Sequence, residues 1–247
     1  MPAEQHKRFP NVWLIGGEDV QLRLPFVRAL KSRGFPVTVC GTMNADASEY
    51  LDVAFQGYSM KRRLAPLADL GTFYQLRRLF RERKPDLVHA FDTKPGLLAP
   101  LAAGVEGVQV SIRTITGMGS TFSSATPAAR LLQFVYRGLQ RRVDPACQMT
   151  VFQNTDDQSY FLEHHLVDAN RQMLISGSGV DTDHLATKAA ANGAAERVRH
   201  DLGLGNRLVC MMVARLVREK GVLEFLKAAK IVRERVPEAA FILVGPS

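Results

Sequence analysis

Short apolar runs that end in glycine or a polar turn alternate with longer segments of helical periodicity along most of the chain. The run "NVWLIGG" at residues 11–17 is typical of a buried parallel strand, and "PVTVCG" at residues 36–41 reads as a second. Between them, residues 22–34 place apolar side chains at helical spacing and end in Gly34, a common helix stop. Together these segments predict a βαβ unit.

The same alternation continues as far as about residue 175. Further strands are predicted at "DLVHAF", "VQVSIRTI" and "QMTVFQN". Further helices are predicted at "GTFYQLRRLFRERKP", "KPGLLAPLAAG", "AARLLQFVYRGLQRRV" and "TDDQSYFLEHHLV". Strands that alternate with helices indicate an α/β fold, in which a parallel sheet is covered by helices on both faces.

The character of the sequence changes near residue 175. Turn-forming "LISGSGVDTDHL" leads into a polar stretch rich in Ala, Gly and Asn, and a strand pattern resumes at "RLVCMMVARL". A composition shift of this kind is typical of a boundary between domains. We therefore predict a first domain at 1–178, a linker at 179–204 and the start of a second α/β domain at 205–247.

Composition narrows the class of protein. No apolar run in the 247 residues approaches the roughly 20 needed to span a bilayer, and no signal peptide is recognised, so a cytoplasmic location is expected. The three cysteines are far apart and form no CxxC or Cys/His cluster. Metal ligation is therefore not predicted, and a sparse, odd cysteine count suits a reducing compartment.

The net charge of +8 is strongly clustered. Such clusters attract anions, namely nucleic acid, anionic lipid or phosphorylated ligands, and the alternative is a solvated basic face without a partner. No nucleic-acid-binding signature is present, so nucleic acid is not an expected partner. The clusters are Lys61, Arg62 and Arg63; Arg77, Arg78, Arg81, Arg83 and Lys84; and Arg137, Arg141 and Arg142.

Two basic residues near the C-terminal end of the sequence predict an anion site. Arg215 lies at the carboxyl end of a predicted strand, where open parallel sheets bind ligands. Lys220 lies in the following loop, before a helix that is expected to begin near Gly221. A guanidinium fork, an ammonium group and a helix N-terminus together favour a diphosphate ligand. A plain surface loop of a basic protein is the alternative interpretation.

An ordered set of segments resembles family 4 glycosyltransferases. The group that is most similar extends lipid-linked oligosaccharides or builds capsular and O-antigen polysaccharides in bacteria. The resemblance covers about residues 11–247 and implies the GT-B fold, in which two Rossmann-like domains face each other across a cleft. The segments are "KPDLVHAFDTKPGLLAPLAA", "RTITGMGSTF", "VFQNTDDQSYFLEHHLV", "LISGSGVDTDHL" and "VARLVREKGVLEFLKAAKIVRE".

This resemblance implies an activity and its partners. The expected reaction moves a hexose or N-acetylhexosamine from a nucleotide-diphosphate sugar, with UDP expected, to a polyprenyl-diphosphate-linked or polysaccharide acceptor with retention of configuration. No metal or other cofactor is implied. The expected location is the inner face of the cytoplasmic membrane, where basic residues would meet anionic lipid. The residues first considered for this contact are Lys61, Arg62, Arg63, Arg77, Arg78 and Arg81.

The resemblance also implies roles for individual residues. Arg215 and Lys220 match the pair that neutralises the donor diphosphate, and Gly16 and Gly17 match a glycine-bearing loop that also contacts the donor. A plain tight turn is the alternative for the two glycines. The residues expected to line the acceptor or sugar site are Asp92, Thr93, Lys94, Thr116, Gly117 and Gly119.

The histidines give no catalytic residue. Many relatives carry a histidine in the loop where this chain has Thr116 and Gly117, so no catalytic residue is assigned. His89 falls inside a predicted strand and is expected to be a core residue. His164 and His165 are expected to lie in a helix and to point to different faces.

Residues 205–247 hold only one helix and two strands of the expected second domain. The acidic segment with which family members grip the donor is absent from them, so we expect a C-terminally truncated fragment that is weak or inactive alone. Two other functions remain open. One is a non-catalytic, membrane-associated module that needs a partner chain, and the other is a nucleotide-sugar epimerase, which shares the two-domain fold.

Overall fold

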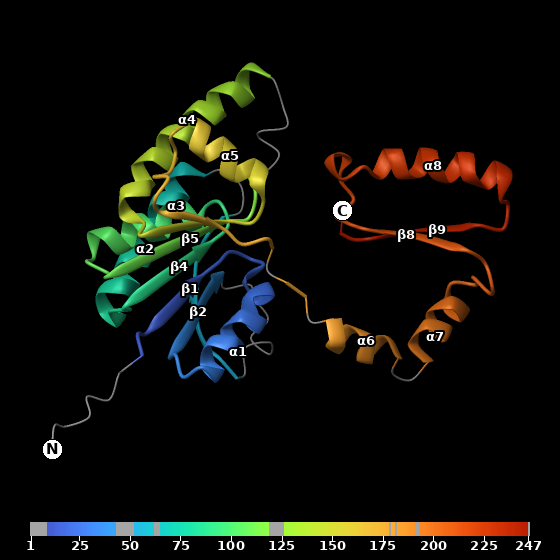
Figure 1. Cartoon of the computed structure of the whole chain (residues 1–247), viewed down its shortest axis with the longest axis horizontal. Helices are drawn as coiled ribbons and strands as arrows, with labels where there is room; N and C mark the ends of the chain where they lie inside the picture. The colour runs from blue at the N-terminus through green and yellow to red at the C-terminus, as the bar shows by residue number, and fades with distance from the viewer. Residues whose placement is uncertain are drawn as a thin grey trace. The chain divides into compact units, whose positions relative to one another are not determined.

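The computed structural model describes residues 9–42, 52–61, 65–118, 126–177, 179–180, 182–190 and 193–246 (Figure 1). The chain divides into two compact units, Met1–Ser178 and Gly179–Ser247. The first unit holds a parallel sheet with helices on both faces, and the second holds a smaller parallel β-α-β unit. Within the described residues, no helix combines the length and apolar character that a membrane crossing requires.

The first unit is built on a seven-stranded sheet in the order β3-β2-β1-β4-β5-β6-β7. Every neighbouring pair of strands is parallel. The chain runs outward from β1 to β3 and then returns to β4 on the other side of β1, so the strand order reverses between β1 and β4. The strands are β1 (Val12–Ile15), β2 (Val37–Thr42), β3 (Ala54–Tyr58), β4 (Leu87–Phe91), β5 (Val110–Ile115), β6 (Met149–Phe152) and β7 (Gln172–Leu174).

Helices cover both faces of this sheet, which confirms the predicted fold class. Alternate residues of a strand point to opposite faces, and β1 shows the consequence. Val12 and Leu14 pack in the cluster that holds α1, whereas Trp13 and Ile15 pack in the cluster that holds α2 and α3. The helices are α1 (Leu24–Ser32), α2 (Pro66–Arg83), α3 (Pro95–Val105), α4 (Pro127–Val143) and α5 (Thr155–Glu163), with the short 3-10 turn η1 (Val20–Arg23) before α1.

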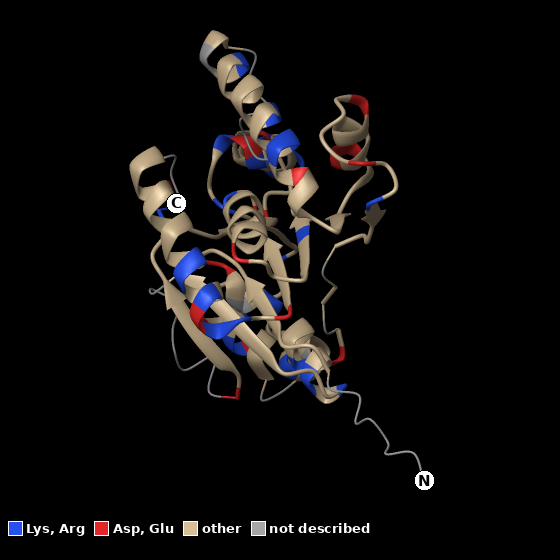
Figure 2. Ribbon diagram, turned by 90° about the vertical axis from the view of Figure 1, so that its left-hand side faces the viewer, with Lys and Arg blue, Asp and Glu red and all other residues tan. Residues whose placement is uncertain are grey.

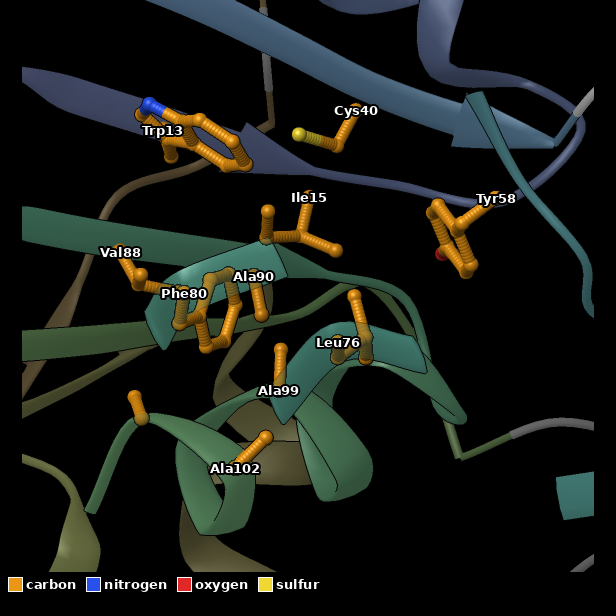
Figure 3. Close-up of a cluster of buried hydrophobic side chains, with 11 residues drawn as sticks. Trp13, Ile15, Cys40, Tyr58, Leu76, Phe80, Val88, Ala90, Ala99 and Ala102 are labelled. Carbon is orange, nitrogen blue, oxygen red and sulfur yellow. The ribbon is translucent and has the colours of Figure 1, made fainter. Parts of the chain in front are cut away.

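The core between the sheet and α2–α3 is close-packed (Figure 3). Trp13 of β1 meets Phe80 of α2 edge to face, with the ring centroids 6.1 Å apart. Small residues of α3, including Ala99 and Ala102, are fully buried and let this helix approach the sheet closely. The small-residue pattern predicted for this helix therefore has a packing role.

Helix α5 ends before the two adjacent histidines, so their predicted helical position is wrong. The helix starts at the N-cap Asn154, whose side chain accepts a hydrogen bond from the Asp157 N–H at 2.7 Å. It ends at Glu163, and His165 has a left-handed backbone with φ of 52°. The turn carries Leu166 into the core, where it is fully buried. Burial of this leucine explains why the helix stops early.

The second unit has one layer of two parallel strands and one helix that connects them. Strand β8 (Val209–Val213) pairs with β9 (Ala240–Val244), and α8 (Val222–Arg235) forms the crossover. This is the β-α-β arrangement that the sequence predicts for residues 205–247. The segment expected to be a linker, 179–204, contains two helices, α6 (Thr182–Ala190) and α7 (Ala194–Asp201).

A buried polar network ties β5 to α4 and the turn that follows it. Arg113 of β5 is fully buried, and its guanidinium donates to Thr150 Oγ1 at 3.0 Å and to Gln140 Oε1 at 2.6 Å. Asp144 lies 3.7 Å from the same guanidinium and pairs with Arg171 at 3.0 Å. Burial lowers the pKa of Arg113, because the charged form is poorly solvated there.

We predict that Arg113→Met destabilises the first unit by about 3 kcal/mol, because it leaves buried acceptors without a donor. Urea unfolding followed by fluorescence of the single tryptophan, Trp13, measures this change. The control is Arg78→Gln, which removes an exposed pair with Glu82 and should leave the free energy of unfolding nearly unchanged. Equal effects of the two substitutions would contradict the structural role of Arg113.

Candidate functional site

Polar side chains gather at the carboxyl edge of the sheet, where the strand order reverses. Gly16 and Gly17 follow β1, Asp92 follows β4, and Thr116 follows β5. The ends of adjacent parallel strands meet at one edge, and open α/β sheets bind ligands at such a reversal. Residues far apart in the sequence are therefore brought together by the topology.

Asp92 is the centre of this group. Thr116 Oγ1 donates a hydrogen bond to Asp92 Oδ1 at 3.2 Å, and a guanidinium nitrogen of Arg23 lies 3.8 Å from the same oxygen. The Asp92 backbone has φ of 70°, in the left-handed region where glycine, asparagine and aspartate are enriched. The structure thus holds a partly exposed carboxylate in a fixed position.

Arg23 is a member of this group that the sequence analysis missed. It ends the short turn η1, and its guanidinium lies 4.8 Å from the centroid of the Phe91 ring. Such a stacked position restricts an arginine side chain, and the side chain of Arg23 is only 11% exposed. Arg23 comes close to the end of β4 because the strand order reverses between β1 and β4. A local sequence motif therefore could not have predicted its place in this group.

The two glycines of the first loop serve different purposes. A Cβ atom on Gly16 would come within 2.7 Å of Val20 Cγ2, so glycine is needed for the close packing of η1. Tyr58 also donates its hydroxyl proton to the Gly16 carbonyl oxygen at 2.6 Å. A Cβ atom on Gly17 would instead lie 3.9 Å from Asp92 Oδ2. Gly16 is therefore explained by packing, and Gly17 borders the Asp92 group.

Lys94 is held by a strong local ion pair. Its Nζ donates to Asp69 Oδ1 of α2 at 2.6 Å and to the Lys61 carbonyl oxygen at 2.7 Å. Both side chains of the ion pair are only 17% exposed. Its positive charge is thus largely matched, and its main effect is to fix the segment after β3 against α2.

An open pocket of about 400 Å³ adjoins the Asp92 group. Tyr58 and Met60 form part of its wall, and the same residues reach Gly16 and Gly17 respectively. Gly71 of α2 also lines it, and a Cβ atom there would meet nothing within 4 Å. The pocket is lined by Thr42, Tyr58, Ser59, Met60, Lys61, Ala68, Gly71, Thr72 and Gln75. This mixture of hydroxyl, amide and small apolar groups suits a sugar ring.

Other predicted site residues contribute less. Thr93 is exposed, and Gly117 borders open space, since a Cβ atom added there would meet nothing within 4 Å. Gly119 lies outside the described residues. In the parts of the chain that the structure describes, no group of three or more His, Cys, Asp or Glu side chains is placed to hold a metal ion.

His89 lies on β4, three residues before Asp92, and is uncharged. Its Nε2 is 2.8 Å from Thr114 Oγ1, and its ring stacks on Phe91 with centroids 4.2 Å apart. Burial, with a smaller contribution from the nearby charge of Arg23, lowers the pKa of His89 to about 3. A neutral, packed imidazole agrees with the expected core role.

This lowered pKa predicts a pH dependence of stability. In the unfolded chain His89 takes up a proton near pH 6.5, whereas in the folded chain it stays neutral to about pH 3. The contribution of neutral His89 to the free energy of unfolding is therefore fully present above about pH 6.5. It decreases as the pH falls towards 3. We expect His89→Gln to remove about 1.5 kcal/mol of the loss between about pH 6.5 and 5, measured by urea unfolding. Substitution of the exposed His200 by Gln is the control, and an unchanged slope in His89→Gln would contradict the assignment.

In the second unit, Arg215 and Lys220 lie in the loop between β8 and α8, as expected. All three basic side chains of this loop, Arg215, Arg218 and Lys220, are at least partly exposed, and within the described residues no ion pair of theirs is found. Lys220 ends the 3-10 turn η6 (Arg218–Lys220), and Gly221 caps α8 with φ of 80°. The unpaired cations of this loop and the N-terminus of α8 can together bind a diphosphate.

The Arg215 loop is fixed by the chain after β9. The Ala214 N–H donates to the Val244 carbonyl oxygen at 3.0 Å, and the Leu216 N–H donates to that of Pro246 at 2.8 Å. A Cβ atom on Gly245 would lie 1.8 Å from the Ala214 carbonyl oxygen, so only glycine permits this approach. The backbone around Arg215 is therefore held on both sides.

The sequence matches a known family over most of the first unit. A model of the "Glycosyl transferase 4-like" family matches residues 12–147, which is more than half of the chain. This span includes Gly16, Gly17, Arg23, Asp92 and Thr116. The family that the sequence segments resemble is thus confirmed.

Two bacterial relatives are similar over most of the chain. UDP-Gal:alpha-D-GlcNAc-diphosphoundecaprenol alpha-1,3-galactosyltransferase of Escherichia coli is 25% identical over 222 residues, which cover 87% of this chain and 55% of that protein. N,N'-diacetylbacillosaminyl-diphospho-undecaprenol alpha-1,3-N-acetylgalactosaminyltransferase of Campylobacter jejuni is 22% identical over 233 residues, which cover 93% of this chain and 61% of that protein. The chain therefore spans less than two thirds of the length of either relative.

Solved structures share the fold. Alpha,alpha-trehalose 6-phosphate synthase of Burkholderia multivorans has a TM-score of 0.71 and 16% identity, and the match covers 97% of this chain and 64% of that one. UDP-GlcNAc 2-epimerase of Neisseria meningitidis has a TM-score of 0.62 and 16% identity, and the match covers 94% of this chain and 64% of that one. Likeness at this level of identity establishes the architecture and leaves the reaction open.

Proposed function

This chain belongs to the glycosyl transferase 4-like family, and we propose that it takes part in the transfer of a sugar from a nucleotide-diphosphate donor to a polyprenyl-diphosphate-linked saccharide. The observation that carries the proposal is the Asp92 group at the edge of the sheet, inside the span that the family model matches. Both relatives are named for transfer to sugars linked to diphosphoundecaprenol, and the Escherichia coli name gives UDP-galactose as the donor. A UDP-hexose or UDP-N-acetylhexosamine is therefore the donor that we propose.

The first unit is proposed to bind the acceptor. Asp92 would accept a hydrogen bond from a sugar hydroxyl group, and Arg23 would hold the Asp92 carboxylate in place. The adjoining pocket has room for a sugar ring. Lys94, which the resemblance places near the acceptor phosphate, is paired with Asp69. We therefore assign Lys94 a supporting role.

The second unit is proposed to bind the donor diphosphate. Arg215 and Lys220 would take up the negative charge that develops as the nucleotide diphosphate leaves. Cations that are already in place lower the barrier, because they need little rearrangement as the charge appears. The proposal assigns this task to the two side chains rather than to a metal ion. Retention of configuration remains an expectation from the family.

We expect Arg215→Ala and Lys220→Ala each to slow sugar transfer by about a hundredfold or more, because each removes a cation from the leaving diphosphate. Arg218→Ala is the matched control, since it removes a positive charge from the same loop. Transfer is measured with the chain in excess over a radiolabelled UDP-sugar. Equal losses in all three variants would point to general electrostatics and contradict the specific roles.

We predict that Asp92→Gly weakens acceptor binding without destabilising the fold. Loss of a hydrogen bond to a charged group should reduce affinity by about tenfold to a hundredfold. Glycine also adopts the left-handed backbone at this position without a steric penalty, so the loop keeps its conformation. Affinity for an undecaprenyl-diphosphate-linked sugar in detergent and urea stability measure the two effects. Unchanged affinity would remove Asp92 from the acceptor site.

One assay separates the proposed function from its rivals. A panel of labelled UDP-hexoses and UDP-N-acetylhexosamines is incubated with the chain, with and without undecaprenyl-diphosphate-linked GlcNAc. Label that enters the lipid only with the acceptor supports the proposal. Interconversion of the free nucleotide sugar would favour an epimerase. Acceptor binding without any transfer would favour a non-catalytic module.

We also propose that the protein acts at the inner face of the cytoplasmic membrane, because a polyprenyl carrier resides in lipid. The basic cluster of α2, which the sequence analysis considers for this contact, is largely neutralised. Arg77 and Arg81 bind Glu106 at 2.7 and 2.9 Å. Arg78 binds Glu82 at 2.8 Å. Arg62 and Arg63 lie outside the described residues. A lipid-facing surface is better sought elsewhere on the first unit.

A further inference from the structure

Helix α4 turns large apolar side chains towards solvent. A surface helix normally buries its apolar stripe and exposes its polar face. Here the buried side includes Tyr136, Gln140 and Val143, two of which are polar. The outward residues at helical spacing are Leu131, Phe134, Val135 and Leu139, with exposed fractions of 66%, 68%, 47% and 45%. An apolar row of this kind marks a contact surface.

The rest of the exposed surface of α4 is basic. Residues 127–143 contain four arginines and no aspartate or glutamate, and Lys and Arg positions recur along this helix at the top of Figure 2. The arginines are Arg130, Arg137, Arg141 and Arg142. Among the residues that the structure describes, none of them forms an ion pair. Arg141 donates a hydrogen bond to the His164 carbonyl oxygen, which leaves its charge uncompensated.

Helix α2 provides a useful comparison, since it also exposes apolar residues. Leu67, Leu70 and Tyr74 are 88%, 51% and 56% exposed. However, α2 contains acidic residues, and three of its four arginines, Arg77, Arg78 and Arg81, are ion-paired as described above. Of these two helices, α4 carries more unmatched positive charge beside its apolar row, because none of its four arginines is ion-paired within the described residues.

We propose that α4 lies on an anionic lipid surface, with its apolar row in the boundary between headgroups and acyl chains. The arginines would then meet lipid phosphates, and both the apolar area and the charge would add to the affinity. Helix α4 directly follows β5, the strand that ends beside Thr116. This connection starts α4 from the edge of the sheet that carries the Asp92 group. The link between α4 and a membrane-bound acceptor rests on the proposed function, whereas the binding of α4 to lipid does not.

Charge argues against a second copy of the chain as the occupant. In a two-fold contact the same surface appears on both partners. Two α4 helices would then bring arginines towards arginines, and neither helix has a carboxylate to pair with them. Repulsion of this kind disfavours the pairing. An anionic lipid surface satisfies both the apolar row and the charge.

Tryptophan fluorescence tests the placement of α4. The chain has a single tryptophan, Trp13, which is buried in the core, so a new tryptophan reports on its own surroundings. With vesicles of equal parts phosphatidylglycerol and phosphatidylcholine, we expect Phe134→Trp to shift to shorter wavelength and to be quenched by brominated acyl chains. The matched control on α2, Tyr74→Trp, should respond little.

An unchanged Phe134→Trp signal, or an equal response from Tyr74→Trp, would overturn the proposal. A blue shift that appears without vesicles and follows protein concentration would instead identify a second copy as the occupant, and would also overturn it.

Charge-removing variants test the second part of the proposal. Each near-surface arginine should contribute about fivefold to vesicle affinity, so Arg130→Gln with Arg142→Gln should lower it by about 25-fold. Arg78→Gln on α2 is the control and should change it little. Circular dichroism checks that the variants remain folded. Unchanged affinity in the double variant, or equal binding to pure phosphatidylcholine vesicles, would overturn the proposal. Vesicle binding needs no sugar transfer, so its failure is distinguishable from failure of the proposed function.

Discussion

The parallel alignment of the strands is the constraint on which the first unit depends. It directs every strand end to one edge, and the reversal between β1 and β4 places the loops after these two strands side by side there. Asp92 then meets Thr116 and Arg23, although the three residues lie on segments that are distant in sequence. The buried pairing of Arg113 with Gln140 and Thr150 holds β5 against α4 behind this edge. The site is therefore a product of topology more than of any one motif.

The two units divide the proposed chemistry by charge. In the first unit Lys94 is paired with Asp69, and hydroxyl, amide and small apolar groups make up most of the pocket wall, which suits neutral hydroxyl groups. In the second unit Arg215 and Lys220 are unmatched within the described residues, which suits a diphosphate. Helix α4 adds unmatched charge beside an apolar row, which suits a lipid surface. The presence or absence of ion pairs thus distinguishes the pocket of the first unit, the Arg215 loop and helix α4. Composition alone shows only that all three regions contain basic residues.

Sequence reasoning recovered what depends on local periodicity. Most helices and strands, the β-α-β start of the second unit and the loop position of Arg215 and Lys220 follow from apolar spacing and turn residues. Strand β3 was missed because its short alternating run, Ala54–Tyr58, is only partly apolar and lies at the sheet edge. The end of α5 was misplaced because burial of Leu166 overrides the helical pattern. Arg23 and the pairing of Lys94 depend on contacts between distant segments, which no single-sequence pattern contains.

The central claim is that the carboxyl edge of the first sheet holds a lipid-linked acceptor. Photo-crosslinking tests it most directly, with an undecaprenyl-diphosphate-linked sugar that carries a photoreactive group on the sugar ring. Mass spectrometry then identifies the labelled peptides. The account predicts labels on the segments around Met60, Asp92 and Thr116, reduced by excess unlabelled acceptor. Labels confined to other segments, or labels that excess acceptor does not reduce, would contradict it.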